Sequence, residues 1–400
     1  MPYDAFTIDT NAVIQGGMDF EAGLLAQLKQ FKDGPTEFII SEIVVRETLK
    51  HLLLSTKKAR DMALAAVNRA FATGLMDEPS REAAVAALKD SRAVARKRLS
   101  AFLEATGAET VPAKLCSIDD LVKSYFETTA PFEATGDKKH EFPDALALLS
   151  LQEWARSSGK TILAASGDNG WKAFAEASEH VFVEGDLAAA LGIVQQHTEA
   201  ATVAIEAFLQ AIDDGALEET KASINDQLSD ALVDWEFDVE AWSSIRYEVD
   251  QTELKFGSFE LVKAGEQYAM TIVRLAADET VVRVEMEISA TANADFSLYL
   301  WDSIDREELS MGGTSASSEE TFEASVLLTI AGAIDGAPDQ LEVIGVEVID
   351  ALGSVDMGEV EIDYGGDDDD YDQLQLELEA EGDEAGAADA GNDQADQPAE

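Results

Sequence analysis

Short apolar runs alternate with longer stretches of helical periodicity over the first 195 residues. The apolar runs are rich in β-branched and aromatic residues and are bounded by polar or turn-forming residues, which is typical of buried strands. Strands are predicted at 5–8, 37–40, 161–165 and 181–183, with a weaker one at 109–111. Strands separated by helices are typical of an α/β domain with a parallel sheet.

The helices of this region carry recognisable start signals. Ser41 stands where an N-cap is expected, and Pro143 suits the first turn of a later helix. Residues 57–105 contain two long Ala-rich helical stretches, broken around 74–80. We interpret them as a helical insertion in the α/β domain.

The pattern changes in the second half of the chain. Residues 200–233 predict one or two helices, and from about Trp235 the apolar positions recur every second residue. Strands are predicted at 267–275, 282–288, 296–301, 322–330 and 341–348. An antiparallel sheet or sandwich with a polar outer face is therefore expected.

Three segments follow from these patterns. The predicted limits are 1–195 for the α/β domain, 200–365 for a helix plus β-rich accessory domain, and 366–400 for a disordered acidic tail. Residues 351–400 hold eighteen acidic residues and no Lys or Arg, a composition that cannot bury a core.

Charge is distributed very unevenly along the chain. The formal net charge is −52, but residues 1–200 hold 21 basic and 29 acidic residues, against 7 and 51 in residues 201–400. Adaptation to high salt would make both halves acidic, so that interpretation is disfavoured. Only the block 51–100, with ten basic and five acidic residues, is positive. A polyanionic partner is therefore expected to bind the first half.

Several classes of protein are disfavoured by composition. The single cysteine, Cys116, leaves no internal disulfide framework and no cysteine-based zinc site. No apolar run approaches the roughly 20 residues of a membrane helix, and the first residues lack the basic and apolar regions of a signal peptide. We expect a cytoplasmic protein with no membrane partner.

Four carboxylates stand at informative positions. Asp9 and Asp168 each follow a predicted strand, Glu47 lies on the helix after the second strand, and Asp144 opens a later helix. Ligands of open α/β sheets bind at the carboxyl ends of the strands, where these four side chains are expected to meet. Carboxylates packed together repel one another unless a cation neutralises them. Hard divalent ions such as Mg²⁺ take oxygen ligands and can activate water against a phosphodiester.

The order of these motifs resembles a PIN domain. Asp-Thr-Asn follows the first strand, a Glu lies on a helix, an Asp heads a later helix, and Ser-x-Asp-x-x-Trp follows the fourth strand. The resemblance spans roughly residues 4–195. It implies a three-layer α/β/α fold with a parallel sheet, and Mg²⁺- or Mn²⁺-dependent hydrolysis, usually of RNA. It carries over Asp9, Glu47, Asp144 and Asp168 as catalytic metal ligands, supported by Asn11 and Ser166.

The resemblance makes an endoribonuclease the first hypothesis, with RNA as the partner. A nuclease acting on DNA, including single-stranded DNA, is the second, because the same metal chemistry cleaves both. An inactive PIN-fold scaffold for another protein is the third, although an inactive protein has no physical reason to keep four mutually repelling carboxylates.

Two groups of basic residues are candidate nucleic-acid contacts. Lys89, Arg92 and Arg96 are spaced to share one helix face, and Lys138 and Lys139 precede the helix that Asp144 opens. Each group could equally be a solvated surface. The acidic tail could cover the basic face at 81–98 and so act as an intramolecular partner, or a separate regulatory protein could bind the chain. The alternative is a tail that only keeps the protein in solution.

Overall fold

The chain divides into two compact units in a computed structural model that describes residues 3–132, 141–195, 198–302, 307–334 and 337–361. One unit comprises Met1–Asp234, Phe256–Ala290 and Thr321–Leu352, and the other Trp235–Lys255, Thr291–Glu320 and Gly353–Glu400. Part of the β-rich region thus belongs to the same unit as the α/β domain. The limits near 195 and 200, which follow composition, stay a prediction. The tail at 366–400 lies outside the described residues.

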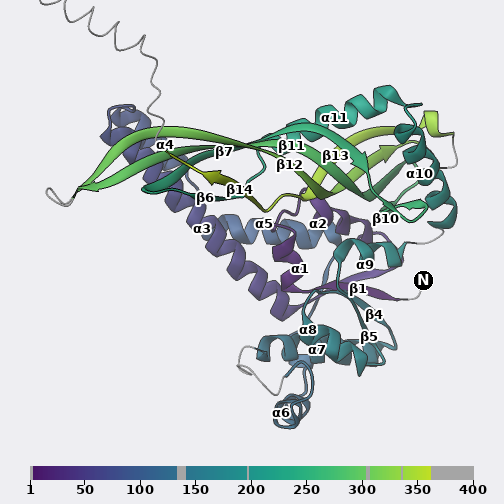
Figure 1. Cartoon of the computed structure of the whole chain (residues 1–400). Coiled ribbons are helices and arrows are strands. Elements are labelled where there is room, and N and C mark those ends of the chain that lie inside the picture. The colour runs from purple at the N-terminus through teal and green to yellow at the C-terminus, as the bar shows by residue number, and fades with distance from the viewer. Residues whose placement is uncertain (1–2, 133–140, 196–197, 303–306, 335–336, 362–400) are drawn as a thin grey trace, which may run out of the picture. The chain divides into compact units, whose positions relative to one another are not determined.

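A parallel sheet forms the centre of the α/β domain (Figure 1). Its five strands lie in the order β3-β2-β1-β4-β5, and every neighbouring pair is parallel. The strands are β1 (Ala5–Ile8), β2 (Glu37–Ser41), β3 (Glu109–Val111), β4 (Ile162–Ala165) and β5 (Val181–Glu184). Strands β1 and β4 are buried along their whole length, as continuous apolar strands covered on both faces are. The five strand predictions are confirmed.

Helices flank this sheet, which confirms the predicted α/β/α class. They are α1 (Thr10–Gln15), α2 (Gly23–Gln27), α3 (Glu42–Ala72), α4 (Glu78–Ala87), α5 (Ser91–Thr106), α6 (Ile118–Glu127), α7 (Phe142–Ser158), α8 (Asn169–Glu176) and α9 (Leu187–Val194), with 3-10 turns at η1 (Leu28–Phe31) and η2 (Ala113–Leu115). Ser41 caps α3 as expected, its side chain accepting a hydrogen bond from the backbone N–H of Ile43. Within the described ranges, no helix is both long and apolar enough to cross a membrane.

The helical insertion differs from its prediction in one respect. After α3, the second helical stretch is divided into α4 and α5, because Asp90 acts as the N-cap of α5 and accepts a hydrogen bond from Ala93 N (2.8 Å). Lys89 therefore lies between the two helices. The prediction that Lys89, Arg92 and Arg96 share a helix face is wrong for Lys89, while Arg92 and Arg96 are one turn apart on α5.

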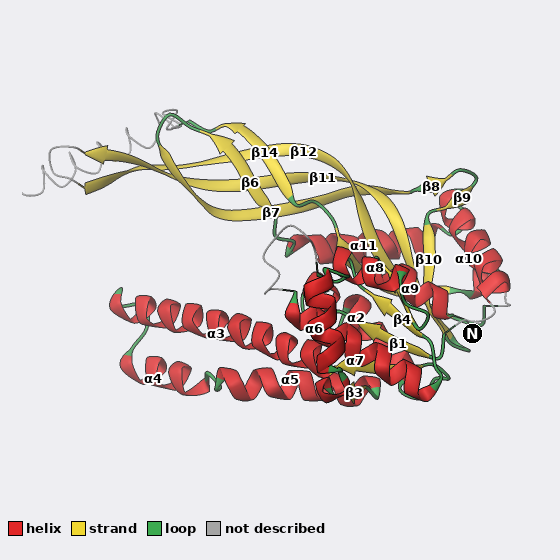
Figure 2. Cartoon of the chain, turned by 90° about the horizontal axis from the view of Figure 1, so that it is seen from below, coloured by secondary structure: helices red, strands yellow, loops and turns green. Residues whose placement is uncertain are grey.

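Residues 53–98 form what we term the helical arm. In it the far part of α3 lies beside α4 and the start of α5 (Figure 2). All residues of the helical arm are described, and Ala95 alone among them is buried. The large apolar side chains of Met62 and Leu75 are 62% and 85% exposed. Because it has so little core, the arm depends on helix propensity and caps for its local stability.

The β-rich region begins with two helices, α10 (Thr198–Asp213) and α11 (Glu218–Val233). Strands β10 to β13 follow one another in an antiparallel sheet, and β7 pairs with β11. The strands of the region are β6 (Asp238–Trp242), β7 (Arg246–Leu261), β8 (Lys263–Ala264), β9 (Gln267–Tyr268), β10 (Met270–Leu275), β11 (Glu279–Asp302), β12 (Glu307–Ala331), β13 (Glu342–Asp350) and β14 (Ser354–Glu359). In β11, Val284, Met286 and Ile288 are buried in alternation with polar neighbours, which confirms the period-two pattern.

Candidate active site

The carboxyl edge of the parallel sheet places Asp9 at the centre of the candidate site. Asp9 directly follows β1, and its backbone N–H donates to the carbonyl of Ala165 at the end of β4 (3.1 Å). Its side chain is only 4% exposed and accepts a hydrogen bond from Ser166 Oγ at Oδ2 (2.8 Å). A buried carboxylate needs such a partner, and Ser166 provides it, while the supporting role of Ser166 in catalysis stays a prediction.

Asp168 lies two residues after Ser166, in the turn that follows β4. Its backbone N–H donates to Ser166 Oγ (3.1 Å), so one hydroxyl connects the turn after β4 with Asp9. The side chain of Asp168 also caps α8, accepting at Oδ1 from Trp171 N (3.1 Å). The capping role and a ligand role are compatible, because a carboxylate has a second oxygen.

Glu47 reaches the site from α3. It is half-buried and accepts a hydrogen bond at Oε2 from Thr10 Oγ1 (2.7 Å), the residue directly after Asp9. Thr10 is itself 7% exposed, so the contact is shielded from water. Sequence reasoning missed Thr10, whose only signal was its place in the Asp-Thr-Asn motif.

Asp144 lies in the first turn of α7, after Pro143, as predicted. Trp171 Nε1 donates to Asp144 Oδ1 (3.0 Å) across a separation of 27 residues. Trp171 is fully buried in the core, and it is also the hydrogen-bond donor to Asp144. A buried indole N–H needs an acceptor, and here the acceptor is a site carboxylate.

The charges of the other three carboxylates act on Asp144, and the charge of Asp168 acts on Asp9. Burial raises the pKa of Asp144 from 3.8 to about 6; the Trp171 hydrogen bond opposes this rise, and the charges of Asp9, Asp168 and Glu47 add to it. Burial also raises the pKa of Asp9, although the hydrogen bonds that its carboxylate accepts lower it in part. The cost of gathering these charges is typical of a site that a cation completes.

The donor set fits a hard divalent cation in its chemistry, although the side chains are not arranged as a coordination shell. Across the described residues, no three His, Cys, Asp or Glu side chains converge closely enough to hold a metal ion. The hydrogen bonds described above engage one oxygen each of Asp9, Glu47 and Asp144. A shell at the roughly 2.0–2.1 Å distances of Mg²⁺ therefore requires side-chain adjustment, with waters completing it.

Other residues border the same edge. Asn11 donates its backbone N–H to Asp9, and its Nδ2 lies 3.4 Å from where a Cβ on Gly167 would be. Lys172, which sequence reasoning missed, is exposed on α8 one turn after Asp168, with Nζ 3.1 Å from a Cβ built on Gly185. Lys138 and Lys139 lie outside the described residues. Arg92 and Arg96 are exposed on the helical arm, and Lys89 beside them.

Comparison with known proteins gives one match. The family model described as the PIN domain matches residues 7–171, a range that contains the end of β1, β2 to β4 and all four carboxylates. No curated protein and no solved structure matches the chain.

Proposed function

We propose that this chain, whose residues 7–171 match the PIN-domain family model and thereby indicate nuclease-type chemistry, is a metal-dependent endoribonuclease. The observation that carries the proposal is the gathering of Asp9, Glu47, Asp144 and Asp168 at one sheet edge, where Asp144 is affected by the charge of the other three. The oxygens of these four carboxylates would serve as ligands to a Mg²⁺ or Mn²⁺ ion, whose charge would offset that repulsion.

The chain's own residues prepare the carboxylates for this role. Ser166 holds Asp9, Thr10 holds Glu47 and Trp171 holds Asp144, so each keeps a fixed orientation. When bound, the ion supplies a water of lowered pKa and neutralises charge on the phosphate. These contacts keep the carboxylates close to the site and limit the side-chain adjustment that binding an ion would still require. Asn11 and Ser166 act as supporting polar groups.

RNA is the proposed substrate, and single-stranded DNA the second candidate. The test is to incubate the full-length protein with labelled RNA and DNA of the same sequence, each in linear and circular form, with Mg²⁺, Mn²⁺ or EDTA. Metal-dependent opening of circular RNA supports an endoribonuclease. Opening of circular DNA alone supports the second candidate, and degradation of linear molecules alone contradicts internal cleavage. Intact substrates under all metal conditions favour the inactive scaffold.

The helical arm is the proposed surface for capturing this substrate. It lies within the block 51–100, which holds ten basic and five acidic residues in a protein of net charge −52 and is the one positive block of the sequence. Lys89, Arg92 and Arg96 are exposed, and Arg92 and Arg96 point from one helix within a turn of each other. Exposed cations in such an arrangement attract phosphates without reading sequence.

Replacing Lys89, Arg92 and Arg96 together by Ala is expected to weaken RNA binding and flatten its dependence on salt. Three lost phosphate contacts reduce the slope of log Kd against log salt by about 2, at roughly 0.7 per contact on a single strand. Fluorescence anisotropy at four salt concentrations, with the Mg²⁺ omitted to prevent cleavage, measures the slope.

The matched control removes three exposed lysines outside the arm, Lys29, Lys114 and Lys123. It has the same change in net charge and is expected to keep a slope within about 0.5 of the wild-type value. Equal slopes for the two triple variants would assign the binding to overall charge rather than to the arm.

A further inference from the structure

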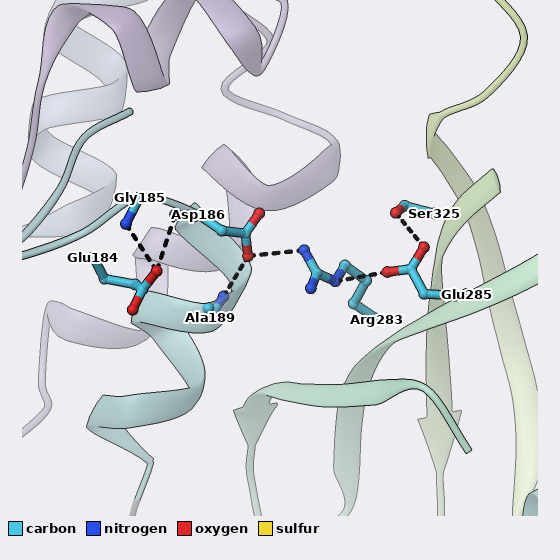
Figure 3. Close-up of polar contacts among 7 residues, drawn as sticks. All are labelled: Glu184, Gly185, Asp186, Ala189, Arg283, Glu285 and Ser325. Carbon is cyan, nitrogen blue, oxygen red and sulfur yellow. Dashed lines mark hydrogen bonds and ion pairs between the residues drawn. The ribbon is translucent and has the colours of Figure 1, made fainter. Parts of the chain in front are cut away.

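Arg283 of β11 contacts the turn that follows β5 (Figure 3). Its Nη1 lies 2.8 Å from Asp186 Oδ1, and its Nε lies 3.2 Å from Glu285 Oε1. Glu285 in turn accepts a hydrogen bond from Ser325 Oγ of β12 (2.6 Å). The guanidinium is thus fixed on its own sheet by Glu285 while it reaches Asp186, and both strands belong at this point to the same compact unit as the α/β domain.

Asp186 holds the turn after β5 in place. It is the N-cap of α9, and the oxygen that Arg283 contacts also accepts from Ala189 N (2.7 Å). One residue before it, the Gly185 N–H donates to Glu184 Oε1 (2.8 Å). The turn at residues 184–186 is therefore fixed by its own carboxylates and, through Arg283, by the antiparallel sheet.

This turn continues directly into the candidate active site. The carbonyl of Glu184 accepts from Ser166 N (2.9 Å), and Ser166 Oγ is the donor to Asp9. The Gly185 carbonyl also lies only 3.8 Å from where a Cβ on Gly167 would stand, so the turns after β4 and β5 are neighbours. A continuous series of polar contacts thus leads from Arg283 to the carboxylate of Asp9.

We propose that Arg283 is a positioning residue: through Asp186 and the 184–186 turn, the antiparallel sheet holds Ser166 where it orients Asp9 for catalysis. The inference rests on the proposed nuclease function and gives the β-rich region a part in it. The Arg283 and Asp186 side chains are 21% and 47% exposed, so water and salt weaken their attraction. The expected effect of losing the pair is correspondingly moderate, about two- to fivefold in kcat.

The test compares Arg283→Gln, Asp186→Asn and the double variant. Asp186→Asn keeps an oxygen for the Ala189 cap but removes the charge that Arg283 contacts, and Arg283→Lys retains the charge. We expect each single variant to lower kcat about two- to fivefold with KM unchanged, the double variant to be no worse than either, and Arg283→Lys to recover part of the loss. Amide hydrogen exchange at residues 166–168 and 184–186 is expected to become faster in the same variants.

Arg274→Gln is the matched control, because it removes an ion pair with Glu279 in the same sheet. It is expected to leave kcat and these amides unchanged. Additive losses in the double variant, or unaltered exchange at 166–168, would overturn the positioning role. If the wild-type protein cleaves nothing, the proposed function fails, and exchange at 166–168 alone decides whether Arg283 orders the site.

Discussion

Replacing Asp144 by Asn is expected to lower metal-dependent cleavage by about two orders of magnitude or more, with the fold preserved. Asn keeps the oxygen that accepts the Trp171 Nε1 hydrogen bond, so the first turn of α7 keeps its anchor. The negative charge that a divalent ion requires is lost. Single-turnover cleavage of labelled RNA with saturating Mg²⁺ measures the effect.

Glu153→Gln provides the comparison on the same helix. Glu153 forms a surface ion pair with Arg156, and its loss is expected to change cleavage by less than twofold. Wild-type turnover in a folded Asp144→Asn protein would remove Asp144 from the site, and an equal loss in both variants would indicate general damage to α7.

In metal-free protein at pH 7.5, the same Asp144→Asn change is expected to increase the free energy of unfolding by about 1–3 kcal/mol. The folded-state pKa of Asp144 is raised from 3.8 to about 6, so ionising it costs more in the folded protein than in the unfolded one. The stability that this residue contributes is fully present below pH 3.8 and is lost as the pH rises through about 6. Asn carries no charge and avoids that loss.

Urea unfolding in EDTA at pH 4 and pH 7.5 measures this difference. The gain in stability is expected to be largest at pH 7.5 and to fall to roughly a fifth of that at pH 4, where Asp144 is largely protonated in the folded state. A gain of the same size at both pH values would assign it to packing. With saturating Mg²⁺ the wild-type protein is expected to regain the advantage, because the ion binds the folded state.

The parallel strands and the places of the four acids in the fold could be predicted from the sequence because they have local signals, while the role of these acids as metal ligands stays a prediction. Asp9 and Asp168 directly follow apolar strands, and Asp144 follows Pro143 at a helix start. The parts that escaped prediction depend on distant partners. Thr10 bonds Glu47 across 37 residues, and Arg283 reaches Asp186 across 97. The hydrophobic periodicity of the sequence cannot predict such pairings, because they arise only when separate helices and strands pack together.

The break between α4 and α5 shows a different limit. Lys89, Arg92 and Arg96 have helical spacing in the sequence, but the chain leaves the helical conformation at Leu88, and Asp90 caps the start of the next helix. Asp and Asn side chains can hydrogen-bond to nearby backbone groups in place of the helical hydrogen bonds. Hydrophobic periodicity alone does not predict where this happens.

Helix α3 is buried near its start and extends far beyond its buried turns. Val44, Thr48 and Leu52 are the buried residues of this helix, and Glu47 lies among them. The helix continues to Ala72. At 1.5 Å per residue, the end of α3 lies about 37 Å beyond Glu47. A rigid tilt of α3 by about 5° around the buried turns would displace that end by about 3 Å, whereas Glu47 would scarcely move. A displacement at the end of the arm would therefore correspond to a much smaller displacement of Glu47. A spectroscopic label at that end would report small changes in the orientation of α3.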